Sequence, residues 1–352
     1  MGVVVLRALL SRVELFASVV MFCTFARTVQ AHHSQAGLFD PAATIEVTGV
    51  VKSVSWRNPH GHIVFTVTDE AGEAVDWDAE TASVSVLRIR GLDVATLAVG
   101  DRVTIAGSPS RRGRPEILAR NMLLPSGLEF TFGSPTPYFP AGKAGKLYGQ
   151  EVIAGDVERA IASADGLFRV WSTIMSDPAA FPMFKGGYPV NDAGKARIAE
   201  WNPQDNDLLH CGTKGQPLIM ITPLPVEFVL QGDDILFNIE EYDVRRVIHM
   251  APDAVAGEHS QFGFSRGRWE GATLVVETDH IQPQTFDSDG VPQSDQMLTV
   301  ERFTPTADYA RLDYRITVTD PVYFSEPFDL TRYFVWKPGD TVHPYECEER
   351  YL

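Results

Sequence analysis

Several short motifs that mark common enzyme classes are missing from this sequence. It has no His-Glu-x-x-His pair, no papain-like cysteine motif and no Cys-x-x-Cys pair, so no zinc protease, cysteine protease or thiolate zinc site is indicated. It also has no glycine-rich phosphate loop and no alternation of strands with helices, which leaves a Rossmann or P-loop fold without support. The sequence therefore indicates no organic cofactor.

Basic residues are scarce as well. The chain has 30 Lys and Arg against 46 Asp and Glu, a net charge of −16, and its one basic run is "RRGR" at Arg111 to Arg114. Nucleic acid and anionic lipid surfaces attract basic proteins and repel acidic ones. We therefore expect a small-molecule ligand or substrate as the partner, with no nucleic acid and no membrane anchor. The oligomeric state stays open.

Long apolar runs are missing after the first 31 residues, and the run before that point is short. Arg7 and Arg12 precede the apolar stretch "LFASVVMFCTFA", and Val29-Gln30-Ala31 places small residues at the two positions that a signal peptidase reads. This pattern is typical of a secretory signal peptide, because the stretch is too short to span a membrane comfortably. Cys23 lacks the preceding small residue of a lipid-attachment motif. We expect residues 1–31 to be a signal peptide and the protein to be periplasmic or secreted.

Only two cysteines, Cys211 and Cys347, follow the predicted leader. An exported protein meets an oxidising compartment, where an even number of cysteines favours disulfide formation. We predict one disulfide between them, which would tie the middle of the chain to its last residues. Two buried free thiols are the alternative.

The remaining chain is predicted to be mainly β. Residues 32–43 form an N-terminal arm, and residues 44–126 contain five or six short strands with one helix in "SVSVLRIRGL", which suits a small Greek-key barrel of the OB type. Residues 127–200 are a linker rich in proline and glycine, with short helices in "DVERAIASADGLFRVWSTIM" and, after an asparagine cap, in "NDAGKARIAEW".

Residues 201–352 change to a period of two. From about residue 217 apolar and polar side chains alternate through seven or eight segments with short turns, including a hairpin across "WEGA". Sequential antiparallel strands of this kind predict a larger antiparallel barrel or sandwich with a lipocalin-like meander.

Motifs in both halves carry a resemblance to a known family. The segment "AHHSQAGLFD…VTGVVKSVSWRNPHGHIVFTVTDEAGEAVDWDAE…LAVGDRVTIAG" contains His-His-Ser, Phe-Asp, Trp-x-Asn-Pro-His and Gly-Asp-x-Val, and it resembles the DUF6152 family of exported bacterial proteins. The segment "WEGATLVVET…VERFTP…YRITVTDPVYFSEP" is similar to the domain that follows in longer members. The resemblance implies no biochemical role. Two positions depart from the family's pattern: Ala272 replaces an acid, and Gln293, before Ser294, replaces a histidine.

Four histidines suggest a metal site. Cleavage after Ala31 would make His32 the N-terminal residue, whose α-amine and ring nitrogen could then chelate one metal ion. His33, and His60 and His62 from "WRNPHGH", could add imidazoles. A planar set of nitrogen ligands suits Cu(II), so copper is the cofactor that these residues suggest. The alternative is an exposed tail whose histidines bind nothing.

The stretch "EEYDVRRVIHM" is unusual for a barrel strand, because both of its faces would carry ionisable side chains. In a continuous strand Glu240, Tyr242 and Arg246 would share one face and could line a polar cavity. Together with His249 they are the candidates for acid/base catalysis. The alternative is an ordinary strand whose solvated face carries cross-strand ion pairs.

Acids near turns are a further candidate for acid/base work: Asp287, Asp289, Asp295, Glu301 and Asp320. The "DSDG" stretch among them resembles the start of a calcium loop but lacks the distal glutamate, which favours a turn.

Three functions remain open. The first is an exported binding protein that holds a small apolar or metal ligand in the larger barrel or at the domain junction. Aromatic residues could line an apolar cavity in that barrel (among them Trp201, Trp269, Trp336, Tyr314, Tyr323 and Phe324); core packing is the more frequent use of such residues. The second is an exported, cofactor-independent lyase, hydrolase or isomerase with its site in that barrel. The third is a copper protein with an N-terminal histidine site. A barrel interior lined by ionisable groups would favour the enzyme, and one lined by aromatic groups alone would favour the binding protein.

Overall fold

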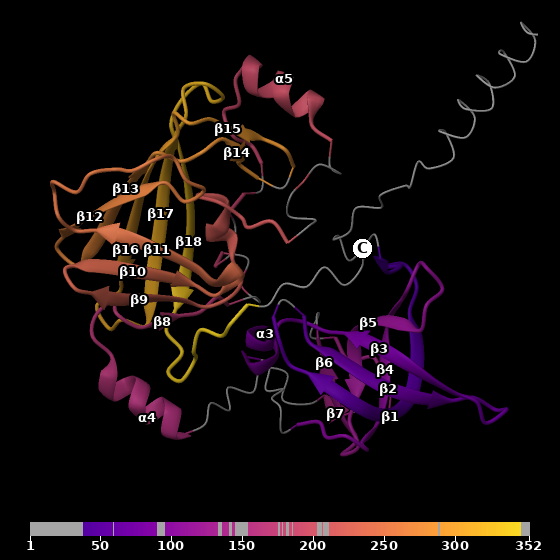
Figure 1. Cartoon of the computed structure of the whole chain (residues 1–352). Helices are drawn as coiled ribbons and strands as arrows, with labels where there is room; N and C mark the ends of the chain where they lie inside the picture. The colour runs from indigo at the N-terminus through magenta and orange to yellow at the C-terminus, as the bar shows by residue number, and fades with distance from the viewer. Residues whose placement is uncertain are drawn as a thin grey trace, which may run out of the picture.

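Two β-barrels follow each other along the chain (Figure 1). The computed structural model describes residues 38–345, except 59, 90–95, 133–135, 141–142, 145–153, 175–176, 178, 181–182, 185, 203–205, 207–210 and 288. The mainly β architecture predicted from the sequence is confirmed. Among the described residues, no helix has the length and apolar character needed to cross a membrane.

The N-terminal barrel is built from five strands: β1 (Ile45–Ser55), β2 (His62–Thr68), β3 (Ala74–Glu80), β4 (Arg102–Pro109) and β5 (Glu116–Leu123). Their order is β3-β2-β1-β4-β5, and a parallel pairing of β3 with β5 closes the sheet on itself. The helix α3 (Val84–Ile89) lies between β3 and β4 in the chain. This is the Greek-key arrangement of an OB-type barrel, as the sequence predicts.

The first barrel closes around an apolar core because its strands alternate inward and outward side chains. The largest fully buried core residues include Phe65, Ile63, Ile105 and, from α3, Leu87. Register shifts in β1 and in the β4–β5 pair mark β-bulges, which sharpen the bend that a small barrel requires.

The C-terminal barrel contains nine strands: β8 (Val170–Trp171), β9 (Val226–Gln231), β10 (Asp234–Ile239), β11 (Val244–His249), β12 (Phe264–Glu270), β13 (Thr273–Asp279), β16 (Leu298–Pro305), β17 (Arg311–Thr319) and β18 (Phe328–Val335). Their order runs β18-β17-β16-β13-β12-β11-β10-β9-β8. Ser172 and Val335 exchange two backbone hydrogen bonds of 2.8 Å, which joins the first strand to the last. The short pair β14 (Gln284–Thr285) and β15 (Pro292–Gln293) lies outside the main sheet, at one end of the barrel (Figure 1).

The predicted run of sequential antiparallel strands is interrupted at one place. β11 and β12 pair in parallel through Ile248 with Ser265 and His249 with Arg266. A parallel neighbour requires a long return connection, and residues 250–263 supply it. The "WEGA" hairpin joins β12 to β13 as predicted.

The predicted linker contributes strands to both barrels. β6 (Leu128–Thr131) and β7 (Lys143–Ala144) extend the first sheet, while β8 opens the second. The helix α5 (Asp192–Glu200) begins at the predicted cap, where Asn191 Oδ1 accepts a 3.0 Å hydrogen bond from the Gly194 amide. The helix α4 (Ala154–Ser163) ends before Gly166, so the predicted longer helix is wrong beyond that point.

The two barrels meet through residues 341–345, which we call the C-terminal strap. Asn58 of the first barrel donates through Nδ2 to Glu240 Oε1 (3.0 Å) and to the strap carbonyl of Pro344 (3.2 Å). Glu240 Oε2 accepts the backbone N–H of His343 at 2.9 Å. Arg88 of α3 contacts the His343 ring, and α3 faces the larger barrel (Figure 1).

Candidate functional site

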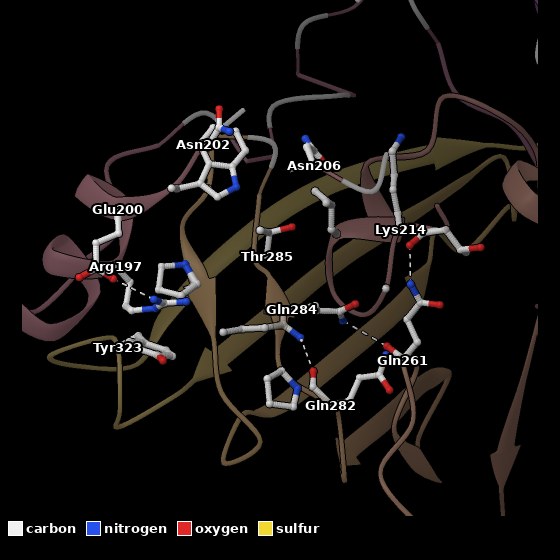
Figure 2. Close-up of a pocket in the computed structure, with 18 residues that line it drawn as sticks. Arg197, Glu200, Asn202, Asn206, Lys214, Gln261, Gln282, Gln284, Thr285 and Tyr323 are labelled. Carbon is white, nitrogen blue, oxygen red and sulfur yellow. Dashed lines mark hydrogen bonds and ion pairs between the residues drawn. The ribbon is translucent and has the colours of Figure 1, made fainter. Parts of the chain in front are cut away.

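A cavity of about 500 Å³ opens at one end of the C-terminal barrel, between α5 and the β14–β15 pair (Figure 2). Its lining comes from several loops at that end of the barrel, so segments far apart in the sequence meet there. Six of the lining residues carry side-chain amides: Asn202, Asn206, Gln261, Gln282, Gln284 and Gln293. A concave site of this size with convergent polar groups is typical of small-molecule binding.

Backbone carbonyls hold several of these amides in place. Gln284 Nε2 donates to the carbonyls of Gln216 (3.0 Å) and Gln261 (3.2 Å). Gln293 Nε2 donates to the carbonyl of Gln216 at 3.0 Å, and Gln261 Nε2 donates to the carbonyl of Thr213. The amide nitrogens of Gln284 and Gln293 each donate to two carbonyls, so the orientation of these two amides is set before any ligand arrives.

Two glycines allow the cavity wall to pack this closely. A Cβ on Gly215 would overlap the Gln284 side chain, and a Cβ on Gly290 would overlap the indole of Trp201. Gly290 also has φ +85°, a conformation that favours glycine. The Trp201 ring therefore packs directly against the Gly290 backbone. The side chain is half-buried at the edge of the cavity.

Two buried amide atoms have no hydrogen-bond partner among the described residues: Gln293 Oε1, an acceptor on a residue that lines the cavity, and Gln216 Nε2, a donor on a residue that does not. Gln216 is 0 % exposed and Gln293 2 % exposed. Their other amide atoms are already bonded, since Gln216 Oε1 accepts from Arg246 and Gln293 Nε2 donates to the Gln216 carbonyl. Turning either amide over would break those bonds, so the two atoms keep these roles.

The charges around the cavity are compensated locally. Arg197 Nη1 lies 2.9 Å from Glu200 Oε2 on α5, and Lys214 Nζ lies 2.6 Å from Glu241 Oε1. The second pair is mostly buried, with side chains 15 % and 9 % exposed. A lining with paired charges and many amides suits an uncharged ligand better than an ion.

Arg246 lies in the barrel interior, 3 % exposed. Its guanidinium forms a bidentate pair with the fully buried Glu301 and also donates to Ser265 Oγ, Thr278 Oγ1 and Gln216 Oε1. Tyr314 completes the group by donating its hydroxyl to Glu301 Oε1 at 2.8 Å. Burial, with the Glu301 carboxylate beside it, raises the pKa of Tyr314 well above its ordinary value. With all five guanidinium N–H groups bonded, Arg246 acts as a structural core residue.

The other predicted catalytic residues do not join Arg246. Residues 241–243 form a short 3-10 turn, η5 (Glu241–Asp243), so β11 begins only at Val244 and the predicted continuous face is broken. Glu240 lies at the contact between the barrels. Tyr242 packs on Tyr345 of the strap, ring centroids 4.9 Å apart, and burial raises its pKa to about 12.

His249 lies apart from this group. It is partly exposed, bonds to Asp234 at 3.0 Å and stacks on Phe264. The Met250 amide, and then this imidazole, hold the pKa of Asp234 below its ordinary value. From Val244 onward the strand alternates as predicted, with Arg246 inward and its neighbours outward.

The barrel interior combines the two linings that the sequence left open. Phe228 stacks on Phe237, Phe303 meets both rings edge-to-face, and Tyr314 packs on Phe303. The Arg246–Glu301 pair is embedded beside these rings. The barrel centre is therefore filled, and the available space lies at its mouth.

The predicted metal ligands are only partly described. His32 and His33 lie outside the described residues. His60 Nδ1 lies 3.1 Å from the Thr81 carbonyl, and His62 Nδ1 lies 3.0 Å from Asp78 Oδ1. Within the described ranges, no group of three or more His, Cys, Asp or Glu side chains could hold a metal ion. Cys347 also lies outside the described residues, so the disulfide with Cys211 stays a prediction.

Two of the acids near turns, Asp287 and Asp320, bond to nearby backbone and hydroxyl groups, whereas Glu301 lies within β16 and pairs with Arg246. Asp287 Oδ1 accepts the amides of Asp289 (2.9 Å) and Val291 (3.0 Å), bonds that fit the predicted turn. Asp320 accepts both the amide and the hydroxyl of Ser294. Burial raises the pKa of Asp287.

The sequence also contains a catalytic-type motif that the structure explains otherwise. Gly263 to Gly267 spells Gly-x-Ser-x-Gly, the pattern of a hydrolase nucleophile, but Ser265 is buried within β12 and bonds to Arg246 and Thr278. Sequence reasoning did not predict the cavity glutamines. Their one feature in the sequence is the high glutamine content of "QPQTFDSDGVPQSDQ", which includes Gln282, Gln284 and Gln293. Of the aromatic residues that could line an apolar cavity in the barrel, Trp201 and Tyr323 border the polar cavity at its mouth, whereas Tyr314 and Phe324 pack in the core.

Comparison with known proteins supports the resemblance seen in the sequence. No curated protein matches the chain. Residues 20–119 match a family described as "Family of unknown function (DUF6152)". Among the described elements, this range includes β1 to β4 and the first half of β5. Over residues 20–119 the chain thus resembles the DUF6152 family, whose function is unknown.

Proposed function

We propose that the protein binds a small, uncharged, hydrogen-bonding molecule in the cavity at the mouth of the C-terminal barrel. The observation that carries this proposal is the set of six lining amides, several of them fixed by backbone carbonyls. Amides that are oriented in advance lower the entropic cost of binding. The predicted signal peptide would place this binding protein in the periplasm or outside the cell.

The ligand proposed from the geometry is polar, whereas the sequence favoured an apolar or metal ligand. Aromatic side chains do fill the barrel, but they pack on one another in its core and only Trp201 and Tyr323 border the cavity. An enzyme with its site in this barrel has less support, because the predicted catalytic residues lie apart. Glu240 lies at the contact between the barrels, Arg246 in the fully hydrogen-bonded core and His249 on the outer face.

A thermal-shift screen tests the proposal. Wild-type protein is heated with neutral polar, anionic, cationic and apolar compounds. A ligand at about 100 times its Kd should raise Tm by several degrees. Neutral polar compounds should account for the shifts, and Gln284→Ala and Trp201→Ala should abolish them, while the exposed Gln231→Ala outside the cavity should not. Shifts that appear only with apolar or charged compounds, or that survive both cavity variants, would contradict the proposal.

A copper site is the second candidate, and one observation favours it. His60 and His62 both direct Nδ1 to a local acceptor, an arrangement found in metal-binding imidazoles, which then bind the metal through Nε2. The remaining ligands would be His32 and His33. Intact mass of the exported protein and its copper content test this candidate together. A chain that begins at His32 and takes up one copper supports it, and a chain that binds none rules it out.

A further inference from the structure

We infer that the contact between the two barrels is acid-sensitive: protonation of His343 breaks its hydrogen bond with Arg88 and loosens the C-terminal strap from α3. The inference concerns the junction of the barrels and does not depend on the ligand proposed for the cavity. It is carried by the hydrogen bonds of the imidazole and by the positive charge beside it.

The bond between the two side chains requires a neutral imidazole. Arg88 Nη1 contacts His343 Nε2, and a guanidinium donates hydrogen bonds but cannot accept them. Nε2 is therefore the acceptor, which leaves the ring proton on Nδ1. The same guanidinium nitrogen donates to Thr341 Oγ1 at 3.3 Å, so Arg88 holds the strap at two points.

A proton on Nε2 would change both the hydrogen bonding and the charge of the ring. An imidazolium donates from both nitrogens, so it cannot accept from Arg88, and its positive charge lies next to that of the guanidinium. Arginine stays charged throughout the physiological pH range, so Arg88 cannot relieve the repulsion by losing a proton. The contact between α3 and the strap is therefore stable only while His343 is neutral.

The other charged groups near the ring do not cancel this repulsion. Asp340, just before the strap, favours the protonated ring, but more weakly than Arg88 disfavours it. Glu240 and Asp243, on either side of Glu241 and Tyr242, accept backbone amides of the strap. Burial of the ring, and then Arg88, hold the pKa of His343 below its ordinary value.

The pH dependence has a definite sign. Because the pKa of His343 is lower in the folded protein than in an unfolded chain, the folded state resists protonation. The contact is intact at neutral pH, weakens as the pH falls below the ordinary histidine pKa of about 6.5, and is lost below the folded-state pKa. The predicted periplasmic or secreted location would expose this junction to the pH of the surroundings.

Hydrogen exchange of the full chain tests the inference at about pH 7.5 and about pH 5, with rates corrected for the intrinsic pH dependence of exchange. In wild type the amides of His343 and Tyr345 should lose about tenfold in protection at the acidic pH, because the strap opens locally. The amides of β16, in the core of the larger barrel, should not. Unchanged protection of the strap amides at the acidic pH would overturn the inference.

His343→Gln and His343→Lys separate the charge of the ring from its packing. Glutamine stays neutral and its Oε1 can accept from Arg88, so protection of the strap should no longer fall at the acidic pH. Lysine carries a positive charge at both pH values, so the strap should be loose even at neutral pH. A loss that persists in His343→Gln would assign the effect to other groups and overturn the inference, as would full protection in His343→Lys at neutral pH.

Arg88→Gln gives an independent measurement on the imidazole itself. Glutamine keeps an N–H donor but removes the charge, so the pKa of His343 should rise towards its ordinary value, as followed in ¹H–¹³C spectra of the histidine rings. The exposed Arg102→Gln, on β4 of the same barrel, should leave that pKa unchanged. If the His343 variants do not fold, this titration still decides the matter: an equal pKa in wild type and Arg88→Gln would contradict the inference.

Discussion

At the scale of single residues, Arg246 shows how a charge is kept inside an aromatic barrel. Its guanidinium forms hydrogen bonds with four side chains, and its carboxylate partner Glu301 also accepts from Tyr314. A buried pair of this kind depends on complete pairing, because a single remaining charge is far costlier than the pair. The alternation of side chains along β11 predicts that Arg246 points inward, as the structure shows. The alternation does not indicate how many hydrogen-bond partners surround the guanidinium inside the barrel.

Arg246→Met should lower the free energy of unfolding by about 3–5 kcal/mol, because Glu301 would stay buried without its cation. The double variant Arg246→Met with Glu301→Leu should recover most of that loss. Urea unfolding of the wild type, both single variants and the double variant measures this. A double variant as unstable as the sum of the single ones would contradict the account.

Asp287 gives a pH prediction at the same scale. Burial raises its pKa, so the folded state holds this proton more tightly than the unfolded state. The stabilising contribution of protonated Asp287 is present at low pH and is lost as pH rises through the folded-state pKa. Asp287→Asn keeps the Oδ1 that accepts the amides of Asp289 and Val291. The variant should therefore melt higher than wild type at pH 7, with a difference that shrinks towards pH 4. Calorimetry that finds the reverse trend would refute this.

At the scale of elements, the short turn η5 connects the two barrels and the cavity. Glu240, just before it, holds Asn58 and the strap. Glu241 holds Lys214 at the cavity. Asp243 accepts the amide of Tyr345. Tyr242 and Asp243 have positive φ angles of 63° and 51°, an uncommon conformation that the surrounding contacts maintain. Sequence periodicity could not find this turn, because the residues around it alternate as a strand would.

Glu240→Gln tests whether this carboxylate is structural. Both of its oxygens accept N–H groups, and an amide nitrogen in place of one oxygen would face a donor. We expect a loss of about 1–3 kcal/mol in stability and faster hydrogen exchange at the His343 amide. The matched change Glu227→Gln, on the partly exposed side of β9, should alter neither. An unchanged exchange rate at His343 would argue against the structural role.

At the scale of the whole molecule, the sequence predicts the architecture better than the site. Alternation, turn residues and an asparagine cap suffice for two β-barrels and for α5, because these signals are local. The cavity is assembled from the end of α5, the stretch before η4 (Leu218–Ile221) and loops after β11, β13 and β17. Side chains so far apart in the chain meet only once the barrel has closed, and neutral glutamines carry no motif that marks them beforehand.

The location of binding provides the most direct test of the central claim. The chain has six tryptophans, and each gives one indole N–H signal in a ¹⁵N–¹H spectrum, with Trp201 assigned from Trp201→Phe. Titration with the neutral compound that raises Tm most should shift the Trp201 signal to saturation and leave Trp77 of the N-terminal barrel and Trp269 of β12 in place. A titration in which Trp201 stays unmoved while Trp77 or Trp269 responds, or in which no neutral compound shifts Trp201, would contradict the account.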